Sequence, residues 1–464
     1  MKLYNTLSRT IEDFVPNEEG KVKFYTCGPT VYGYPHIGNM RTYMSHDVLE
    51  KTLRYLGYDV TRVMNTTDVG HLTSDGDTGD DKMVKTAKEQ KKSVMEIAAY
   101  YTDAFFVDFD LVNNKVPEIV SPASNHIDEY IKIIESLIEK GYGYLAGGNI
   151  YFDTSKLANY YQLTNHKEED MVVGSREGVE FDENKRNQAD FVLWFTKSKF
   201  DDQDLKWPSP WGIGYPGWHI ECTGICIKHF GEYVDIHGGG VDNIFPHQTN
   251  EIAQSEAYLG HKWCNYWFHC EHLLDETGKM SKSQGAKLTV SVLKERGYNP
   301  LSYRYMCLGS HYRKQLVFSY ENLNGAEQAY LKLKNKISLI KEDGELSDGD
   351  FATYNDKFIV ALKDDLNTAN ALTVLHELIK DESVNGYTKL AIIRSFDKVL
   401  SLDLLKKAEL REDHDDIMAL IESRDQAKKE KDFELADSIR DELLEKGVQL
   451  VDSKEGTTYK VIGE

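Results

Sequence analysis

The stretch KFYTCGPTVYGYPHIGNMRTYMSHDVLEKTLRYLGYDVTRVM, residues 23–64, decides the fold. Residues 23–27 form a short β-prone run that a Gly-Pro pair ends. A helical pattern follows, in which apolar residues recur on one face until Gly57 stops it. Residues 59–64 are then typical of a second strand. This strand–helix–strand unit predicts parallel strands with a right-handed crossover, the start of a doubly wound α/β domain.

The rest of the chain predicts several further units. At 464 residues the chain is too long for one ordinary core, and its length suggests about three domains. The predicted units are a Rossmann-like doubly wound parallel-sheet domain over 1–147 and 207–275, an insertion of short strands over 148–206, a connecting region over 276–310, a helical bundle over 311–405 and a small module over 411–464.

Composition is typical of a soluble globular protein, with 41% hydrophobic and 28% charged residues. No apolar run approaches the roughly 18 residues needed to span a bilayer, and the first residues do not form a signal peptide. Six scattered cysteines are too few for a disulfide framework, so reduced thiols fit better. We therefore expect a cytoplasmic protein that does not contact a membrane.

The net charge of −21 counts against a nucleic-acid binder, because neutralising phosphates dominates such affinities. The charge is uneven, however. Residues 311–341 hold six basic side chains, Arg313 and Lys314 among them, against two glutamates. A local basic stripe can attract a polyanion even on an acidic protein. A solvated helix face is the alternative.

Two short motifs suit a bound nucleotide. Residues 35–39, PHIGN, open the predicted helix, where free backbone N–H groups and the positive dipole end favour phosphate and His36 adds a donor. Residues 278–285, GKMSKSQG, place Lys279 and Lys282 in a glycine-bounded loop that can close over a triphosphate. Taken alone, the first motif could be only a turn and a helix cap, and the second only a solvated loop.

Together and in this order, the two motifs resemble the signature motifs of class I aminoacyl-tRNA synthetases. The resemblance implies catalytic roles for His36, Lys279 and Lys282. It also implies that these three residues, with Gly38 and Asn39, bind ATP, which carries Mg²⁺. Asn39 stands where the family usually has a second histidine, but an amide still offers a hydrogen-bond donor.

Four residues far apart in the sequence have the chemistry of a metal site: Cys27, Cys222, His247 and Glu251. Cys27 ends the first strand, and strand ends of a parallel sheet meet at one edge. His247 and Glu251 are four residues apart and share a face if they lie on a helix. Two thiolates, an imidazole and a carboxylate suit tetrahedral zinc. There are two alternatives: Cys222 could pair with Cys226, or the thiols could be buried as small apolar groups.

Four runs resemble those of the cysteinyl-tRNA synthetase family: CGPTVY at 27–32, PGWHIEC at 216–222, DIHGGGVD at 235–242 and FPHQTNE at 245–251. The resemblance implies one Zn²⁺ per chain on the four metal-ligand candidates. It also places Gly239 and Asp242 near the adenosine of ATP, and Thr67 and Trp218 in the pocket for L-cysteine. For Trp218, plain core filling is an equal alternative. Gln248 stands where many members carry a histidine.

The C-terminal module looks like the anticodon-binding domain of the same family. Phe433, Asp437 and Asp452 match positions that face the anticodon, and Lys428 stands where an arginine is common. The resemblance makes the connecting region a stem-contact region and the bundle a tRNA-binding one. It implies a monomer that activates L-cysteine with ATP and transfers it to the 3′-terminal adenosine of tRNA(Cys).

Two other functions stay open at this point. A cysteine:sugar-amine ligase of thiol biosynthesis resembles this family through its zinc site and signature motifs, but it lacks the terminal module. A non-catalytic paralogue that binds tRNA is the second alternative. The presence of both motif lysines and all four ligand candidates disfavours it.

Overall fold

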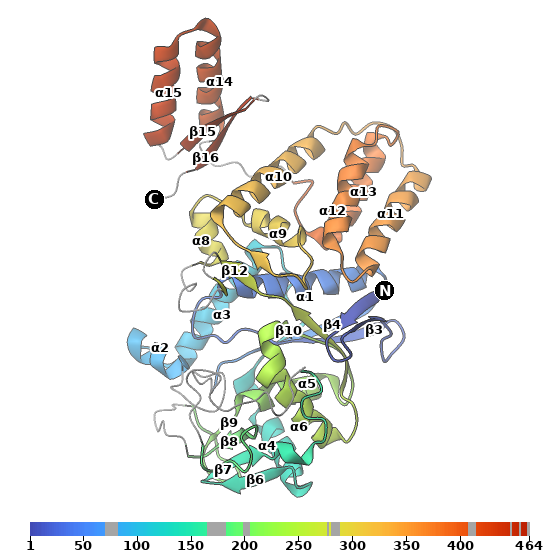
Figure 1. Ribbon diagram of the computed structural model, residues 1–464, viewed down its shortest axis with the longest axis vertical. Helices are drawn as coiled ribbons and strands as arrows, with labels where there is room; N and C mark the ends of the chain where they lie inside the picture. The colour runs from blue at the N-terminus through green and yellow to red at the C-terminus, as the bar shows by residue number, and fades with distance from the viewer. Residues whose placement is uncertain are drawn as a thin grey trace.

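The computed structural model describes residues 1–69, 82–164, 182–197, 205–275, 278–279, 288–406, 414–445, 448–453 and 456–461. Figure 1 shows the α/β part, coloured blue to green, below the helices of the second half, with the C-terminal module at the top. The predicted fold class is confirmed, because a parallel sheet lies between helices and a helical region follows it.

A five-stranded parallel sheet in the order β11-β10-β3-β4-β5 forms the centre of the α/β part. Its strands are β3 Lys21–Thr26, β4 Asp59–Thr66, β5 Ile119–Pro122, β10 Val234–Gly240 and β11 Cys264–Cys270. The chain extends the sheet from β3 through β4 and β5, and later on the other side through β10 and β11. The order therefore reverses between β3 and β10, and the carboxyl ends of these two strands form the crevice where such sheets bind ligands.

Helices cover both faces of this sheet. They are α1 Ile37–Tyr55, α3 Val94–Leu111, α4 Ile127–Glu139, α5 Trp218–Phe230 and α6 Thr249–Leu259. The short helix α2 Lys82–Gln90 packs on α3 instead. Tyr25 packs in the core that holds α4, α5 and α6. Its neighbour Phe24 packs with Leu49 and Leu53 of α1. Consecutive strand residues point to opposite faces, so β3 contributes to both layers.

A four-stranded antiparallel sheet, β6-β7-β8-β9, lies at the lower end of the view in Figure 1. Its strands are β6 Gly143–Ala146, β7 Asn149–Phe152, β8 Phe191–Phe195 and β9 Tyr215–Pro216. The sheet crosses both predicted boundaries of the insertion. Gly147 and Gly148 have φ of 56° and 98°, as a two-residue type I′ hairpin requires. They therefore join β6 to β7 within one unit.

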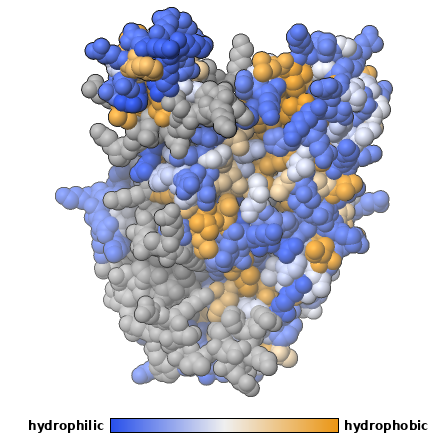
Figure 2. Space-filling model, turned by 45° about the horizontal axis from the view of Figure 1, so that its top comes forward, coloured by the Kyte–Doolittle hydropathy of each residue, from blue (hydrophilic) through white to orange (hydrophobic). Residues whose placement is uncertain are grey.

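The second half is mostly helical, with small sheets at its edges. Its helices are α8 Val290–Glu295, α9 Pro300–Leu308, α10 Tyr320–Ser338, α11 Asp348–Lys363, α12 Thr368–Lys380, α13 Gly386–Leu400, α14 His414–Glu430 and α15 Phe433–Glu445. The remaining strands are β1 Lys2–Asn5, β2 Thr10–Asp13, β12 Leu273–Asp275, β13 Gly278–Lys279, β14 Leu316–Val317, β15 Val448–Ser453 and β16 Gly456–Val461. Among the described helices, none has the length and apolar character to cross a bilayer. Figure 2 shows hydrophilic residues over most of its coloured surface, with separate hydrophobic patches between them.

Buried charges fix α1 to the second half of the chain. The Arg304 guanidinium of α9 donates to Asp47 with an Nη2–Oδ2 distance of 2.6 Å, and both side chains are fully buried. Arg304 also donates to the carbonyls of Val112 and Leu400. One turn from the start of α1, Arg41 donates to four backbone carbonyls of the segments that follow β11 and precede β14. These bonds hold α1 in one position against both neighbours.

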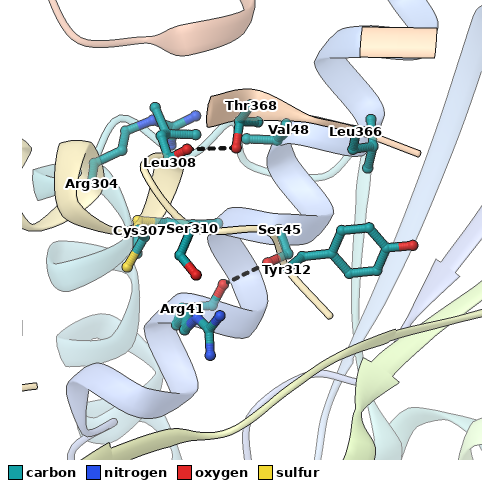
Figure 3. Close-up of a pocket in the computed structure, with 11 residues that line it drawn as sticks. Arg41, Ser45, Val48, Arg304, Cys307, Leu308, Ser310, Tyr312, Leu366 and Thr368 are labelled. Atoms are coloured by element: carbon teal, nitrogen blue, oxygen red, sulfur yellow. Dashed lines mark hydrogen bonds between the residues drawn. The ribbon is translucent and has the colours of Figure 1, made fainter. Parts of the chain in front are cut away.

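A cavity of about 30 Å³ lies at this junction (Figure 3). Arg41, Ser45 and Val48 line it from α1, and Leu308 lines it from α9. The Thr368 hydroxyl closes one side by donating to the Leu308 carbonyl at 2.7 Å. This volume holds about one water molecule. None of the predicted site residues lines the cavity, so it is a packing junction rather than a substrate pocket.

Candidate active site and metal centre

Four side chains converge at the crevice between β3 and β10. Cys27 directly follows β3, and Cys222 lies in the first turns of α5. His247 lies in the short segment Ile244–Gln248, and Glu251 lies in the first turn of α6. One ligand atom from each lies within 4.8 Å of the other three. Cys27 is half-buried and the other three are buried, so the group is approached from the side of Cys27.

These donors fit a metal ion, because two sulfurs, an imidazole and a carboxylate are a common tetrahedral set. The pKa of Cys222 lies well above its ordinary value because the thiol donates to Cys27, is buried and faces Glu251. Burial lowers the pKa of His247, but Glu251 and Cys222 outweigh it and raise the value to about 10. Burial raises the pKa of Glu251, but His237 and His247 outweigh it and lower the value to about 2. A bound cation displaces protons here, so a rise in pH favours binding.

A buried chain of hydrogen bonds supports this group. His237 Nε2 lies 2.8 Å from Glu251 Oε2, and Gln248 Nε2 lies 3.2 Å from His237 Nδ1. Gln248 Oε1 bonds to His269 Nε2, and His269 Nδ1 lies 2.7 Å from the Thr6 hydroxyl. A carboxylate only accepts, so His237 donates from Nε2 and accepts at Nδ1. The amide then donates to His237 and accepts from His269, which fixes the direction of the chain.

Sequence reasoning missed His237 and His269 as parts of the site. Both lie inside strands of mainly apolar or glycine residues, His237 at the middle of β10 and His269 next to the carboxyl end of β11. A histidine within a strand that leads to candidate metal ligands could have indicated these roles. Metal ligands are usually oriented by hydrogen bonds from such neighbouring side chains.

Two predictions concern residues of α5: that Trp218 lies in a substrate pocket, and that Cys226 is an alternative partner of Cys222. The Trp218 ring stacks on the His247 ring with centroids 4.2 Å apart, so the indole borders the four-residue group. His219 Nδ1 lies 3.0 Å from His247 Nδ1. Cys226, the alternative partner of Cys222, lies one turn farther along α5 in the apolar core and is not part of the group.

The first nucleotide motif forms the cap of α1. His36 is the N-cap: its Nδ1 accepts from the Asn39 backbone N–H at 3.1 Å, and the Asn39 amide oxygen accepts from the His36 N–H at 3.3 Å. Because Nδ1 accepts, the neutral imidazole carries its hydrogen on Nε2. A Cβ on Gly38 would lie 2.9 Å from His36 Nδ1, so glycine leaves room for this ring. The motif therefore presents a histidine donor beside a helix N-terminus, as a phosphate site requires.

The other predicted nucleotide and substrate residues surround the same crevice. Thr67 is buried after β4, and its backbone bonds to Pro29 of the loop that follows Cys27. Gly239 lies at the end of β10, where a Cβ would meet the Gln248 amide at 2.8 Å. Asp242 follows it and is exposed. For the lysine motif, the backbone of Lys279 belongs to β13 and pairs with β12, while Lys282 lies outside the described residues.

The predicted tRNA contacts come from the second half of the chain. Arg313 pairs with Asp365, at 2.6 Å between Nη2 and Oδ2, so its charge already has a partner within the protein. Lys314 is exposed. In the C-terminal module, Phe433 is 63% exposed at the start of α15, and Asp437 forms an ion pair with Arg440. Lys428 lies in α14 and the backbone of Asp452 in β15. Their role in tRNA binding stays a prediction.

Comparison with known proteins places the chain in a family. A family model described as the catalytic domain of class I (C) tRNA synthetases matches residues 13–328, and one described as the DALR domain matches residues 357–404. A curated cysteine–tRNA ligase of Treponema denticola is 46% identical over 490 residues, and that of Borreliella burgdorferi is 44% identical over 481 residues. Each alignment covers 99% of both chains.

Solved structures agree on the fold. Mycobacterium tuberculosis methionyl-tRNA synthetase in complex with methionyl-adenylate aligns with a TM-score of 0.53 at 14% identity, over 82% of this chain and 88% of that one. A second structure of that protein, bound by Met-AMP, gives a TM-score of 0.53 at 16% identity. The chain therefore belongs to the class I tRNA synthetases, in the family whose curated members carry the name cysteine–tRNA ligase.

Proposed function

We propose that this chain is a cysteine–tRNA ligase. It activates L-cysteine with ATP to cysteinyl-adenylate and transfers the amino acid to the 3′-terminal adenosine of tRNA(Cys), releasing pyrophosphate and AMP. The observation that carries the proposal is the identity of 46% to a curated cysteine–tRNA ligase over 99% of both chains. The convergence of two thiols, an imidazole and a carboxylate at the sheet crevice supports the choice of amino acid.

In this proposal Cys27, Cys222, His247 and Glu251 hold one Zn²⁺ per chain. Zinc binds a thiolate sulfur well and lowers the pKa of a thiol, which favours cysteine over serine. A hydrophobic pocket separates such isosteres poorly, whereas a lost coordination bond is a large penalty. Trp218, stacked on His247, and Thr67 line the cysteine pocket, and the half-buried side of the group admits the substrate.

For the first step, the cysteine carboxylate attacks the α-phosphorus of Mg²⁺-ATP in line. His36 donates from Nε2 to the phosphates beside the positive dipole end of α1, while Gly38 and Asn39 shape this end. Lys279 and Lys282 neutralise charge on the departing pyrophosphate. Positioning and charge stabilisation account for the rate, because no covalent enzyme intermediate is needed.

The remaining parts of the molecule have roles in binding ATP and tRNA. Gly239 and Asp242 bind the adenosine, with the Asp242 carboxylate suited to the ribose hydroxyls. The connecting region contacts the tRNA stem, the bundle binds tRNA with Arg313 and Lys314 at its edge, and the C-terminal module reads the anticodon. We propose a cytoplasmic monomer. A sugar-amine ligase is less well supported, since the curated relatives match nearly the whole chain, including the C-terminal module.

The test is charging of unfractionated tRNA with labelled cysteine, with labelled serine and a sugar amine as competing substrates. We expect cysteine-specific, tRNA-dependent charging; product on the sugar amine instead would support the other ligase. Exchange of Cys222 for Ser is expected to lower zinc content and cysteine-dependent pyrophosphate exchange together. Cys226→Ser is the matched control, because it changes a buried thiol on the same helix outside the group. Full activity of zinc-free Cys222→Ser protein contradicts the zinc assignment.

A further inference from the structure

A basic surface lies beside the crevice, on a helix that the proposed function leaves without a role. Residues 82–92, which form α2 and the turn after it, contain five lysines and one glutamate, in a chain with a net charge of −21. Four of these lysines are exposed: Lys85, Lys88, Lys91 and Lys92. Protein surfaces usually intersperse both signs of charge. This concentration of one sign marks a local site of attraction for a polyanion.

Exposed aromatic rings adjoin these lysines. Tyr34 and Tyr100 are 43% and 45% exposed, and their hydroxyls lie 2.6 Å apart. Tyr101 packs edge-on against both rings, at 5.1 Å in each case. The Lys92 ammonium lies 4.8 Å from the centroid of the Tyr100 ring. We call Tyr34, Tyr100 and the four exposed lysines the α2–α3 surface.

The surface packs against the loop that follows Cys27. Val31, in the loop after Cys27, packs in one core with residues of α2 and α3. The Val31 backbone N–H donates to the Thr67 carbonyl at 3.2 Å. Tyr34 precedes His36 by two residues, so the aromatic end of the surface lies at the mouth of the nucleotide site. Helices α2 and α3 lie side by side at the left of Figure 1.

We propose that the α2–α3 surface binds the single-stranded 3′ end of tRNA and guides its terminal adenosine to the adenylate. Proteins bind single-stranded nucleic acid by pairing a positively charged path for phosphates with aromatic rings for bases, and this surface has both. The inference rests on the proposed function, because a ligase of this kind must bring an unpaired 3′ end to the site at His36. It adds a contact that the predicted tRNA residues of the second half do not supply.

Charge removal tests the phosphate path. The variant K85Q/K88Q/K91Q/K92Q is compared with wild type and with K2Q/K21Q/K132Q/K262Q, which removes four exposed lysines that lie outside both the α2–α3 surface and the predicted tRNA-binding parts of the second half. We expect cysteine-dependent pyrophosphate exchange, which needs no tRNA, to stay within about twofold of wild type in both. The kcat/KM for tRNA in charging falls about tenfold or more only in the first variant. The slope of log kcat/KM for tRNA against log salt concentration becomes shallower by about 0.7 for each phosphate that the variant no longer neutralises.

Ring removal tests the stacking part. Tyr100→Leu is expected to lower kcat/KM for tRNA by about 5- to 100-fold, and Tyr100→Phe, which keeps the ring, should stay near wild type. Equal reductions in the two lysine variants overturn the proposal, since net charge then explains the effect. Loss of pyrophosphate exchange in the first variant overturns it in favour of an ATP-binding surface. Normal charging by the first variant and by Tyr100→Leu also overturns it. Wild-type protein that charges no tRNA refutes the proposed function instead.

Discussion

The replacement of Gln248 by glutamate gives a sharp test of how the metal group is positioned. The Gln248 amide nitrogen lies 3.2 Å from His237 Nδ1 and 3.7 Å from Cys27 Sγ, so both of its hydrogens have acceptors. Its oxygen bonds to His269. Glutamate has the same shape but only accepts when ionised. The change therefore removes two donors and places a carboxylate oxygen opposite the Cys27 sulfur.

The magnitude follows from these hydrogen bonds. A buried group that loses its hydrogen-bond partner costs about 1–3 kcal/mol. Removal of an outer partner of a metal ligand typically weakens metal binding by about 10- to 100-fold, which is the same range. Because one substitution disturbs the surroundings of two ligands, Cys27 and Glu251, we expect the upper end, about 100-fold weaker zinc binding. We also expect a raised KM for cysteine.

Zinc affinity is measured by competition with a chromogenic chelator, and the KM for cysteine by pyrophosphate exchange. Gln248→His is the matched control, because a neutral imidazole accepts at one nitrogen and donates from the other. It should retain zinc affinity within about tenfold. A Gln248→Glu protein with wild-type zinc affinity and unchanged KM would refute the role of this side chain.

Three other substitutions have defined outcomes. Asp47→Asn leaves the buried Arg304 guanidinium unpaired, and we expect it to cost about 3–5 kcal/mol, measured by urea unfolding followed by circular dichroism. Burial raises the pKa of Asp47, but Arg304 and other contacts outweigh it and lower the value below 3.8, so the ionised carboxylate stabilises the fold above that pH. The stability difference between wild type and variant should therefore narrow as the pH falls below 3.8; a constant difference contradicts the ion pair. Asn39→Ala removes one half of the reciprocal cap with His36 and should lower pyrophosphate exchange about fivefold, from a loss of about 1 kcal/mol. An unchanged exchange rate would show that the Asn39 half of the cap is not needed to position His36 for catalysis. Gly224→Ala places a Cβ 2.4 Å from a tyrosine ring carbon of α4, and we expect a loss of about 1–3 kcal/mol, seen as a lower thermal midpoint.

The first α/β unit was predictable because its signals are local. Residues 23–64 show a strand, a helix with an apolar face and a second strand, and β3, α1 and β4 follow that order. The four ligand candidates are spread over 225 positions, and their convergence depends on the reversal of strand order between β3 and β10. The chemistry of the side chains indicated a metal site at these four residues. Only the resemblance to a family favoured it over a Cys222–Cys226 pair or thiols buried as small apolar groups.

Other features depend on tertiary contacts that no local pattern shows. The short strands over 148–206 predict an insertion that begins at 148, but Gly147 and Gly148 form a hairpin that joins β6 to β7 within one sheet. Arg313 contributes to a basic stripe in the sequence, yet Asp365, 52 residues later, binds its guanidinium. His237 and His269 were missed because periodicity treats a buried histidine as part of the core, and only the three-dimensional structure shows what it bonds to.

The continuity of α1 has a mechanical consequence. This single helix of 19 residues is about 28 Å long, and it carries His36 at its first end and the buried partner of Arg304 near its middle. A tilt of about 5° over that length displaces the far end by roughly 2.5 Å, enough to make or break a hydrogen bond to a phosphate. If tRNA binds the bundle as proposed, a shift of the bundle therefore moves His36 directly, because one rigid helix connects the two.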